Sequence, residues 1–166
     1  MFKLKPLHPD AVPAALAKAE RYRLLNEPLE AESICRDILR LEPDNHAALV
    51  TLLLALTDQF EEHLGVAVQQ AKEVVARFAD DYSRAYYQGI VCERRAKAHF
   101  KRGGPHAGYS AYEWLREAME AFEQATERRP PGDDSAILRW NTCVRLLRCH
   151  PELKPAPEDT FHPLLE

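Results

Sequence analysis

Features that would mark a membrane, secreted or nucleic-acid-binding protein are scarce in this sequence of 166 residues. The most apolar stretch, AALVTLLLALT, is too short to span a bilayer. The first residues, MFKLKPLHPDAVP, contain two lysines but no apolar run after them, and prolines interrupt them, which argues against a secretory signal. The 22 basic and 26 acidic side chains leave a net charge of −4, whereas phosphate-dominated nucleic-acid binding needs a basic excess. We therefore expect a cytoplasmic protein with no nucleic-acid partner and no membrane partner.

The four cysteines are widely spread and form no CxxC pair, which argues against a structural zinc site and against a disulfide framework. Cys35, Cys92 and Cys143 lie among apolar neighbours at helical spacing. A buried free thiol behaves as a small hydrophobic side chain, so we expect these three residues to belong to the core. Cys149 lies near the end of the chain, and we expect it to be exposed.

Signatures of catalysis and of cofactor binding are absent from the sequence as well. It contains no HExxH pair, no nucleophile motif and no phosphate loop with a Lys-Ser/Thr ending, although KRGGPHAGY has two adjacent glycines. Gly-Gly-Pro marks a turn, so this segment predicts a plain connection between two helices. His99 and His106 flank that turn, and two histidines alone are too few ligands for a typical metal site. The sequence thus predicts no catalytic residue, no metal and no cofactor.

What the sequence does contain is one amphipathic pattern that occurs twice. The whole chain, with 46% hydrophobic and 29% charged residues, has the composition of a globular protein about one domain long. The stretch EAMEAFEQATERRPPGDD carries a small residue, a ring, a small residue and a proline at steps of four, three and five, and LEAESICRDILRLEPDNH repeats these steps. The matching positions are Ala118, Phe122, Ala125 and Pro130 in the later stretch and Ala31, Cys35, Ile38 and Pro43 in the earlier one.

Residues three, four and seven apart lie on one face of a helix, so these steps predict two helices that end at the prolines. Neighbouring segments complete three helix pairs and one further helix. Asn26 is expected to close the first helix in a left-handed conformation before Pro28 begins the second, and Asp44 or Asn45 is expected to cap the third. The seven expected helices lie within residues 11–26, 29–46, 44–60, 65–78, 82–100, 110–130 and 133–147.

This arrangement resembles the tetratricopeptide repeat (TPR) family, whose unit of about 34 residues pairs two antiparallel helices and ends in a proline. The matching residues are Ala19, Tyr22, Ala31 and Pro43 in the first unit and Gly89, Ala118, Phe122, Ala125 and Pro130 in the third, whereas Leu53 and Ala79 depart from the pattern in the second. The resemblance implies an all-α, right-handed α-solenoid of three helix hairpins plus a C-terminal capping helix. The implied divisions are an N-terminal extension (1–9), a TPR-like domain (10–148, with repeats of about 12–45, 46–81 and 82–132 and a capping helix 133–148) and a C-terminal tail (149–166).

In the TPR family the first helix of each pair lines a concave face, so the resemblance implies a non-catalytic protein–protein interaction module or scaffold. We expect this face to bind a peptide or helix through an apolar middle with charges at its rim. Some members of the family grip a C-terminal carboxylate with Lys and Asn, but apolar residues occupy those positions here, so a carboxylate clamp is not expected. The residues projected onto the face are Leu16, Glu20, Arg23, Val50, Leu54, Asp58, Tyr86, Ile90 and Arg94.

Three alternatives stay open for these helices. The apolar residues of the face could simply pack between the repeats, or they could lie under the chain's own C-terminal tail, where Phe161, Leu164 and Leu165 form a small apolar cluster. The chain could be a structural homo-oligomer. It could also be a metal-dependent or enzymatic protein built on a helical-repeat scaffold.

The third helix pair has far more residues between Gly89 and Ala118 than the first pair has between the equivalent residues Ala19 and Ala31. Its helices are therefore expected to extend past their neighbours as an ordered arm. Ser110 and Glu113 predict a capping box at the start of its second helix. Four aromatic residues lie near the tip, and they either pack against one another or form an interface for self-association or for a partner. These residues are Phe100, Tyr109, Tyr112 and Trp114.

Overall fold

The described part of the chain is all-helical. This computed structural model describes residues 1–157, which contain a short 3-10 turn, seven α-helices and no strand. Among these helices, none combines the length and the apolar character that crossing a membrane requires. In chain order the elements are η1 (Pro9–Ala11), α1 (Val12–Leu24), α2 (Pro28–Leu41), α3 (His46–Asp58), α4 (Phe60–Ala76), α5 (Asp81–Arg102), α6 (Ala107–Glu127) and α7 (Ser135–Cys149).

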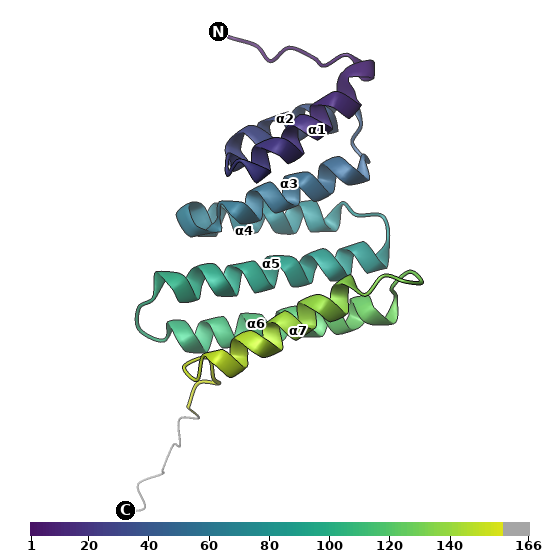
Figure 1. The fold of residues 1–166 in the computed structure, drawn as a ribbon. Helices are drawn as coiled ribbons and strands as arrows, with labels where there is room; N and C mark the ends of the chain where they lie inside the picture. Colours follow the sequence, from purple (N-terminus) through teal and green to yellow (C-terminus); the bar gives the residue numbers. More distant parts are fainter. Residues whose placement is uncertain (158–166) are drawn as a thin grey trace, which may run out of the picture.

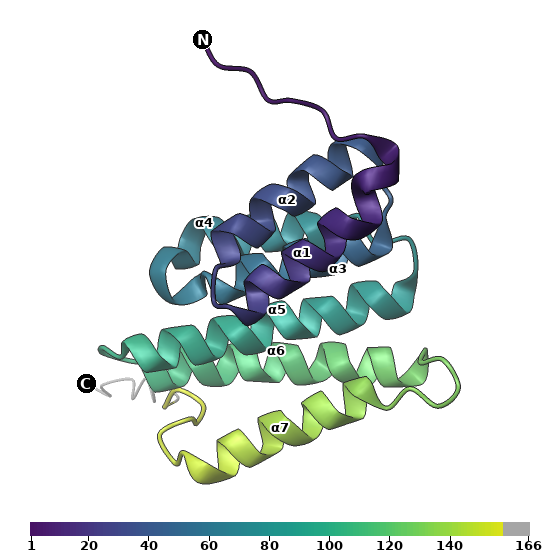
Figure 2. The ribbon, with the colours of Figure 1, turned by 45° about the horizontal axis from the view of Figure 1, so that its top comes forward.

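Helices that follow each other in the chain pack side by side, and they form layers in chain order. The first layer contains α1 and α2, the second α3 and α4, and the third α5 and α6, with α7 packed on α6 (Figure 1). The α1 helix also contacts α3, and α3 also contacts α5, so the first helices of successive layers touch. Figure 2 shows the N-terminus beside the first layer and α7 at the opposite end of the stack. Each layer can therefore bury its apolar side against the next one.

Short polar signals set several helix ends as the sequence predicts. Asn26 has a left-handed φ of 61°, and Pro28 is the first residue of α2. The side chain of Asn45 accepts a hydrogen bond of 2.9 Å from a backbone N–H in the first turn of α3 and so caps this helix. Asp80, which was not predicted as a cap, closes the start of α5 in the same way with a hydrogen bond of 2.7 Å. These caps satisfy backbone groups that would otherwise lack partners at the helix ends.

Two helix starts differ from the sequence prediction. The α4 helix begins at Phe60 rather than Gly65, since a kink at His63 (φ −131°, ψ 45°) joins an extra turn to it. The α6 helix begins at Ala107 rather than Ser110, and His106 precedes it with a left-handed φ of 64° and no side-chain cap. The expected capping box is therefore wrong, because Ser110 lies inside the helix, where its backbone N–H donates to the carbonyl of His106 at 3.1 Å.

The seam between α5 and α6 explains the small residues of the repeated pattern. Gly89 lies against the ring of Phe122, because a Cβ atom on Gly89 would be only 2.4 Å from Cε1 of this ring. Phe122, Ala118 and Ala125 are all fully buried. The missing side chain at Gly89 thus lets the α5 backbone approach the ring closely, at a packing density that leaves no room for a methyl group.

The third helix pair is long, but it does not form a free arm. The α5 and α6 helices contain 22 and 21 residues and pack along each other. Near their shared end, Lys101 pairs with Glu61 of α4, with Nζ and Oε2 2.6 Å apart. On the other side, a Cβ atom on Gly108 would lie 2.4 Å from the carbonyl oxygen of Glu152. The expectation of a protruding arm is wrong because α4 and the segment after α7 both pack against its end.

Candidate functional site

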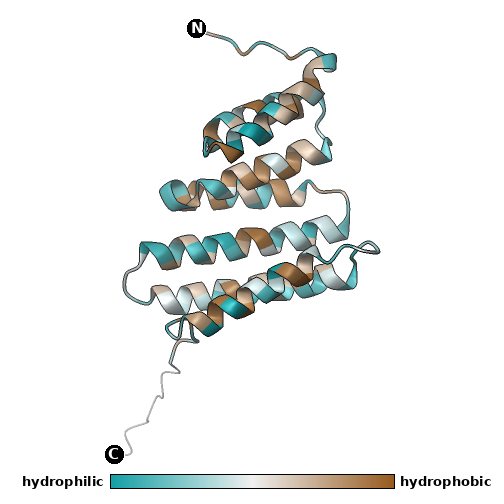
Figure 3. Ribbon diagram, in the orientation of Figure 1, coloured by the Kyte–Doolittle hydropathy of each residue, from teal (hydrophilic) through white to brown (hydrophobic). Residues whose placement is uncertain are grey.

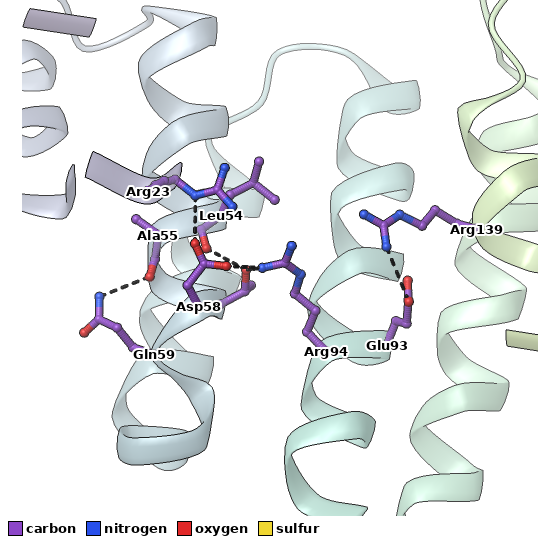
Figure 4. A network of polar contacts seen from close by, with 9 residues as sticks. Arg23, Leu54, Ala55, Asp58, Gln59, Glu93, Arg94 and Arg139 are labelled. Atoms are coloured by element: carbon purple, nitrogen blue, oxygen red, sulfur yellow. Dashed lines mark hydrogen bonds and ion pairs between the residues drawn. The ribbon is translucent and has the colours of Figure 1, made fainter. Parts of the chain in front are cut away.

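Three of the residues projected onto the concave face meet in a polar cluster, the Arg–Asp–Arg bridge, which consists of Arg23, Asp58 and Arg94 (Figure 4). The Nε of Arg23 on α1 donates to Oδ2 of Asp58 on α3 at 2.8 Å, and Nη1 of Arg94 on α5 donates to Oδ1 at 2.5 Å. The same Nη1 also donates to the hydroxyl of Thr57 at 2.8 Å. Charge-assisted hydrogen bonds of this kind are strong and directional. One carboxylate therefore joins the first helices of three successive layers.

The bridge lines an open pocket of about 340 Å³. Within residues 1–157, Arg23 donates side-chain hydrogen bonds only through Nε and Arg94 only through Nη1, so both guanidinium groups keep further N–H donors. The side chains of the three bridge residues are 22–25% exposed, which leaves these donors within reach of a ligand. The other residues that line the pocket are Asn26, Thr57, Phe60, Glu61, Lys97 and Ala98.

The apolar part of the projected face is only partly accessible. Ile90 is 1% exposed, so it belongs to the core and offers no surface to a partner. Glu20 is exposed, and no ion pair links it to another residue within the described chain. The face therefore combines a narrow apolar strip with a charged end at the Arg–Asp–Arg bridge. The strip consists of residues that pack against the core on one side and stay half-buried: Leu16, Val50, Leu54 and Tyr86.

A second polar cluster surrounds a buried carboxylate on α5. Glu93 is fully buried, and its Oε1 pairs with Lys97 one turn later on the same helix. Arg139 on α7 approaches the same Oε1 at 3.5 Å (Figure 4). The other oxygen, Oε2, has no hydrogen-bond partner within residues 1–157. A buried carboxylate is tolerated where cations neutralise it, so this cluster links α7 to α5 by charge.

The aromatic residues near the end of the third pair make contacts within the chain. The guanidinium of Arg95 lies over the ring of Trp114 at 4.0 Å from its centroid, and His99 meets the same ring edge-on at 4.8 Å. Phe100 meets the ring of His150 edge-on at 5.2 Å between centroids. Trp114 and Phe100 thus pack within the chain, but the packing interpretation expected the four aromatic rings to meet one another, and within residues 1–157 no ring–ring contact joins two of them. All four aromatic residues of this end are half-buried: Phe100, Tyr109, Tyr112 and Trp114.

The cysteines lie where the sequence predicts. Cys35, Cys92 and Cys143 are buried and free, and Cys149 is exposed. Burial raises the pKa of the Cys35 and Cys143 thiols to about 12 and that of the Cys92 thiol to about 11. At neutral pH these three thiols are therefore protonated and poor nucleophiles.

The two histidines that flank the turn between α5 and α6 each contact an aromatic ring. His99 lies against Trp114, and His106 stacks on Tyr109 with ring centroids 5.7 Å apart. No group of three or more His, Cys, Asp or Glu side chains that could hold a metal ion occurs within residues 1–157. Of the two polar clusters, the Arg–Asp–Arg bridge lines the pocket with all three of its residues, whereas Glu93 of the other cluster is fully buried.

Four residues complete the polar clusters without having been selected from the sequence: Thr57, Glu93, Lys97 and Arg139. The spacing of Glu93 and Lys97 is typical of an ion pair on one helix, but no sequence pattern marks Glu93 as buried. Arg139 lies 46 residues from Glu93 in the chain, so only the fold brings the two together. Neither a family model, nor a curated protein, nor a solved structure matches this chain.

Proposed function

We propose that this chain is a non-catalytic protein–protein interaction module of the tetratricopeptide type, which acts in the cytoplasm and holds a peptide or helix of a partner protein. The proposed architecture is a right-handed α-solenoid of three helix pairs, with α7 as its capping helix. The observation that carries the proposal is the Arg–Asp–Arg bridge, because each of the three pairs contributes one residue to it. Arg23 and Asp58 are 35 residues apart, and Asp58 and Arg94 are 36 apart, close to the repeat length of about 34 in that family.

The contacts between layers support this repeat type. The first helix of each pair touches the first helix of the next pair, since α1 contacts α3 and α3 contacts α5. In repeat proteins that stack in this way, each unit contacts only its neighbours, and the first helices together line one extended surface. The Arg–Asp–Arg bridge and the apolar strip both lie on residues of α1, α3 and α5, so they share that surface.

The chemistry of the surface indicates what kind of segment it binds. The apolar strip suits hydrophobic side chains spaced along a helix or an extended peptide, because their burial supplies affinity. The unused N–H donors of Arg23 and Arg94 suit a carboxylate or a backbone carbonyl of the same segment, which would fix its direction. We therefore propose a partner segment that places apolar side chains on the strip and an acceptor group in the pocket beside Asp58.

Affinity capture from the native lysate tests this proposal when it compares matched variants. Val50→Lys combined with Leu54→Lys places two charges on the apolar strip, while the long lysine stems still cover the neighbouring core. Glu123→Lys adds positive charge at an exposed position of α6 and serves as the control. We expect a protein that is captured by the natural chain and by the control but is lost from the strip variant, with helical circular dichroism equal in all three.

Two results would count against the proposed function. The first is a set of captured proteins that does not distinguish the strip variant from the control. The second is a raised melting temperature with metal ions or nucleotides, because a ligand that binds only the folded state stabilises it. That second result would favour an enzyme or a metal-dependent protein on the same helices.

A further inference from the structure

The turn between α1 and α2 exposes an apolar corner that lies apart from the concave face. It is formed by Leu24 at 87%, Leu25 at 61% and Leu29 at 61% exposure, and the end of the first layer is correspondingly coloured as hydrophobic in Figure 3. Soluble chains expose single leucines often, but a group of large apolar side chains at one turn is characteristic of a contact surface. We call these three residues the leucine corner.

Carboxylates lie on the α2 side of the leucine corner, whereas Arg21 and Arg23 lie in the last turn of α1 on its other side. A pocket of about 290 Å³ opens beside Leu29, and its lining includes Glu27, Glu30 and Glu62 but no lysine or arginine. These three glutamates are exposed and form no ion pair within residues 1–157. A segment that fits this surface therefore needs apolar side chains with positive charges next to them.

The chain itself carries such a segment in its first five residues. Residues 1–5, MFKLK, place Phe2 and Leu4 in alternation with Lys3 and Lys5. Phe2 is fully exposed and Leu4 is 74% exposed, so neither side chain is buried against the rest of the chain. Figure 3 shows the alternation of hydrophilic and hydrophobic positions along this stretch. We refer to residues 1–5 as the basic segment.

We propose that the basic segment of one molecule docks on the leucine corner of a second copy, and that the two copies do so reciprocally in a dimer. Phe2 and Leu4 would cover the exposed leucines, and Lys3 and Lys5 would pair with the glutamates around them. The inference rests on two exposed apolar surfaces of the same molecule, the basic segment and the leucine corner, that carry opposite charges.

The geometry favours a second copy over the same copy. Lys5, Pro6 and Leu7 lie against the C-terminal end of α2, which is the end of the first layer opposite to the leucine corner. The α1 helix between the two ends contains 13 residues and is about 20 Å long at 1.5 Å per residue. The five residues of the basic segment span at most about 17 Å even when fully extended. The segment therefore falls short of its own corner.

A two-fold axis closes the arrangement. When two α1–α2 layers lie antiparallel, the basic segment of each chain comes to the corner of the other, so both contacts form in one dimer and no open chain of molecules results. The surface involved is small, and interfaces of this size are weak. We therefore expect dimers to form at protein concentrations of about 0.1–1 mM, which corresponds to a weak dissociation constant.

Charge exchange between the two surfaces tests the proposal. Sedimentation equilibrium on the full chain would compare the natural protein with Lys3→Glu/Lys5→Glu and with Glu27→Lys/Glu30→Lys. We expect each variant alone to stay monomeric, because its segment and its corner then carry the same charge. An equal mixture of the two variants should dimerise as the natural chain does, because both reciprocal contacts regain opposite charges. High salt should weaken the natural dimer by screening these contacts.

The control variant Glu123→Lys/Glu127→Lys changes two exposed carboxylates of α6 that lie outside the corner, and it should dimerise like the natural chain. The proposal is overturned when the natural chain is monomeric at about 1 mM, the upper end of the expected range. It is equally overturned when the charge variants dimerise by themselves or when their mixture does not. Dimerisation that survives both charge changes but is lost on deletion of residues 158–166 would assign the contact to the C-terminal tail instead.

Discussion

Gly89→Ala tests the close packing contact between α5 and the ring of Phe122 on α6. The added Cβ atom would lie 2.4, 2.6 and 2.9 Å from three carbons of the Phe122 ring, well inside the van der Waals distance. The ring is fully buried and packs against Tyr86, with centroids 6.0 Å apart, so it has little freedom to move. Overpacking of this kind costs about 1–3 kcal/mol of the free energy of unfolding. Alanine also favours a helix over glycine by about 1 kcal/mol, which offsets part of that cost.

Gly65→Ala is the matched control, because Gly65 lies in α4 and a Cβ atom there would meet no other atom within 4 Å. It gains the same helix propensity without the clash. The difference between the two variants therefore isolates the clash, and we expect Gly89→Ala to be less stable than Gly65→Ala by about 1–3 kcal/mol. For a chain of this length that difference corresponds to a melting temperature lower by about 2–12 °C. Urea unfolding followed by circular dichroism measures the free energies directly.

A double-mutant cycle identifies the atom responsible. Phe122→Leu removes the ring carbons that the new methyl group would meet, so Gly89→Ala should cost at least about 1 kcal/mol less in that background than in the natural chain. If Gly89→Ala proves as stable as Gly65→Ala, or if its cost is the same with and without the ring, then the close approach of α5 to Phe122 does not limit the fold and the seam has been misinterpreted.

Three further predictions concern the bridge, the thiols and the end of the third pair. Asp58→Ala leaves two guanidinium groups without their shared carboxylate, and urea unfolding should show a loss of about 1–2 kcal/mol, whereas a loss near zero would mean that solvent replaces the bridge. At neutral pH a thiol reagent should label only Cys149 in the folded chain, because the other three cysteines are buried and their thiols have raised pKa values. After unfolding it should label all four. Rapid labelling of a second thiol in the folded chain would contradict this prediction. Gly108→Ala should push the segment after α7 away from α6, since the new Cβ atom would lie 2.4 Å from the Glu152 carbonyl oxygen, and amide hydrogen exchange there should accelerate; unchanged exchange would show that the segment adjusts without leaving.

Features that depend on a few neighbouring residues could be predicted from the sequence. Asn26 tolerates a left-handed conformation and Pro28 cannot continue a hydrogen-bonded helix, so the first turn follows from local chemistry. The all-helical fold follows from apolar residues at helical spacing, and the burial of the three core cysteines follows from the same periodicity. The starts of α4 at Phe60 and of α6 at Ala107 were missed because the kink at His63 and the left-handed His106 belong to no recognised capping pattern.

Features that depend on the distance between helices could not be predicted in this way. Ile90 lies at the same helical spacing as accessible residues, but α5 is close enough to its neighbours to bury it completely. The charge on Glu93 would normally predict an exposed position, and its burial is offset by Lys97 on the same helix together with Arg139 from a distant one. The expectations about Phe161, Leu164 and Leu165 of the C-terminal tail lie outside the described residues.

The two polar clusters together give α5 a particular role in the candidate site. Glu93 and Arg94 are consecutive, so their side chains leave α5 in directions about 100° apart, the rotation per residue of a helix with 3.6 residues per turn. Arg94 reaches α3, and Glu93 pairs with α7. A hydrogen-bonded ion pair holds only in one register, although replacement of such pairs by apolar residues often raises stability. A buried carboxylate with an unpartnered oxygen is therefore a poor choice for stability and a good one for fixing the position of α5 against the helices on both sides. Arg94 also lines the pocket, so in the proposed function this fixed position would set where the acceptor group of a partner lies.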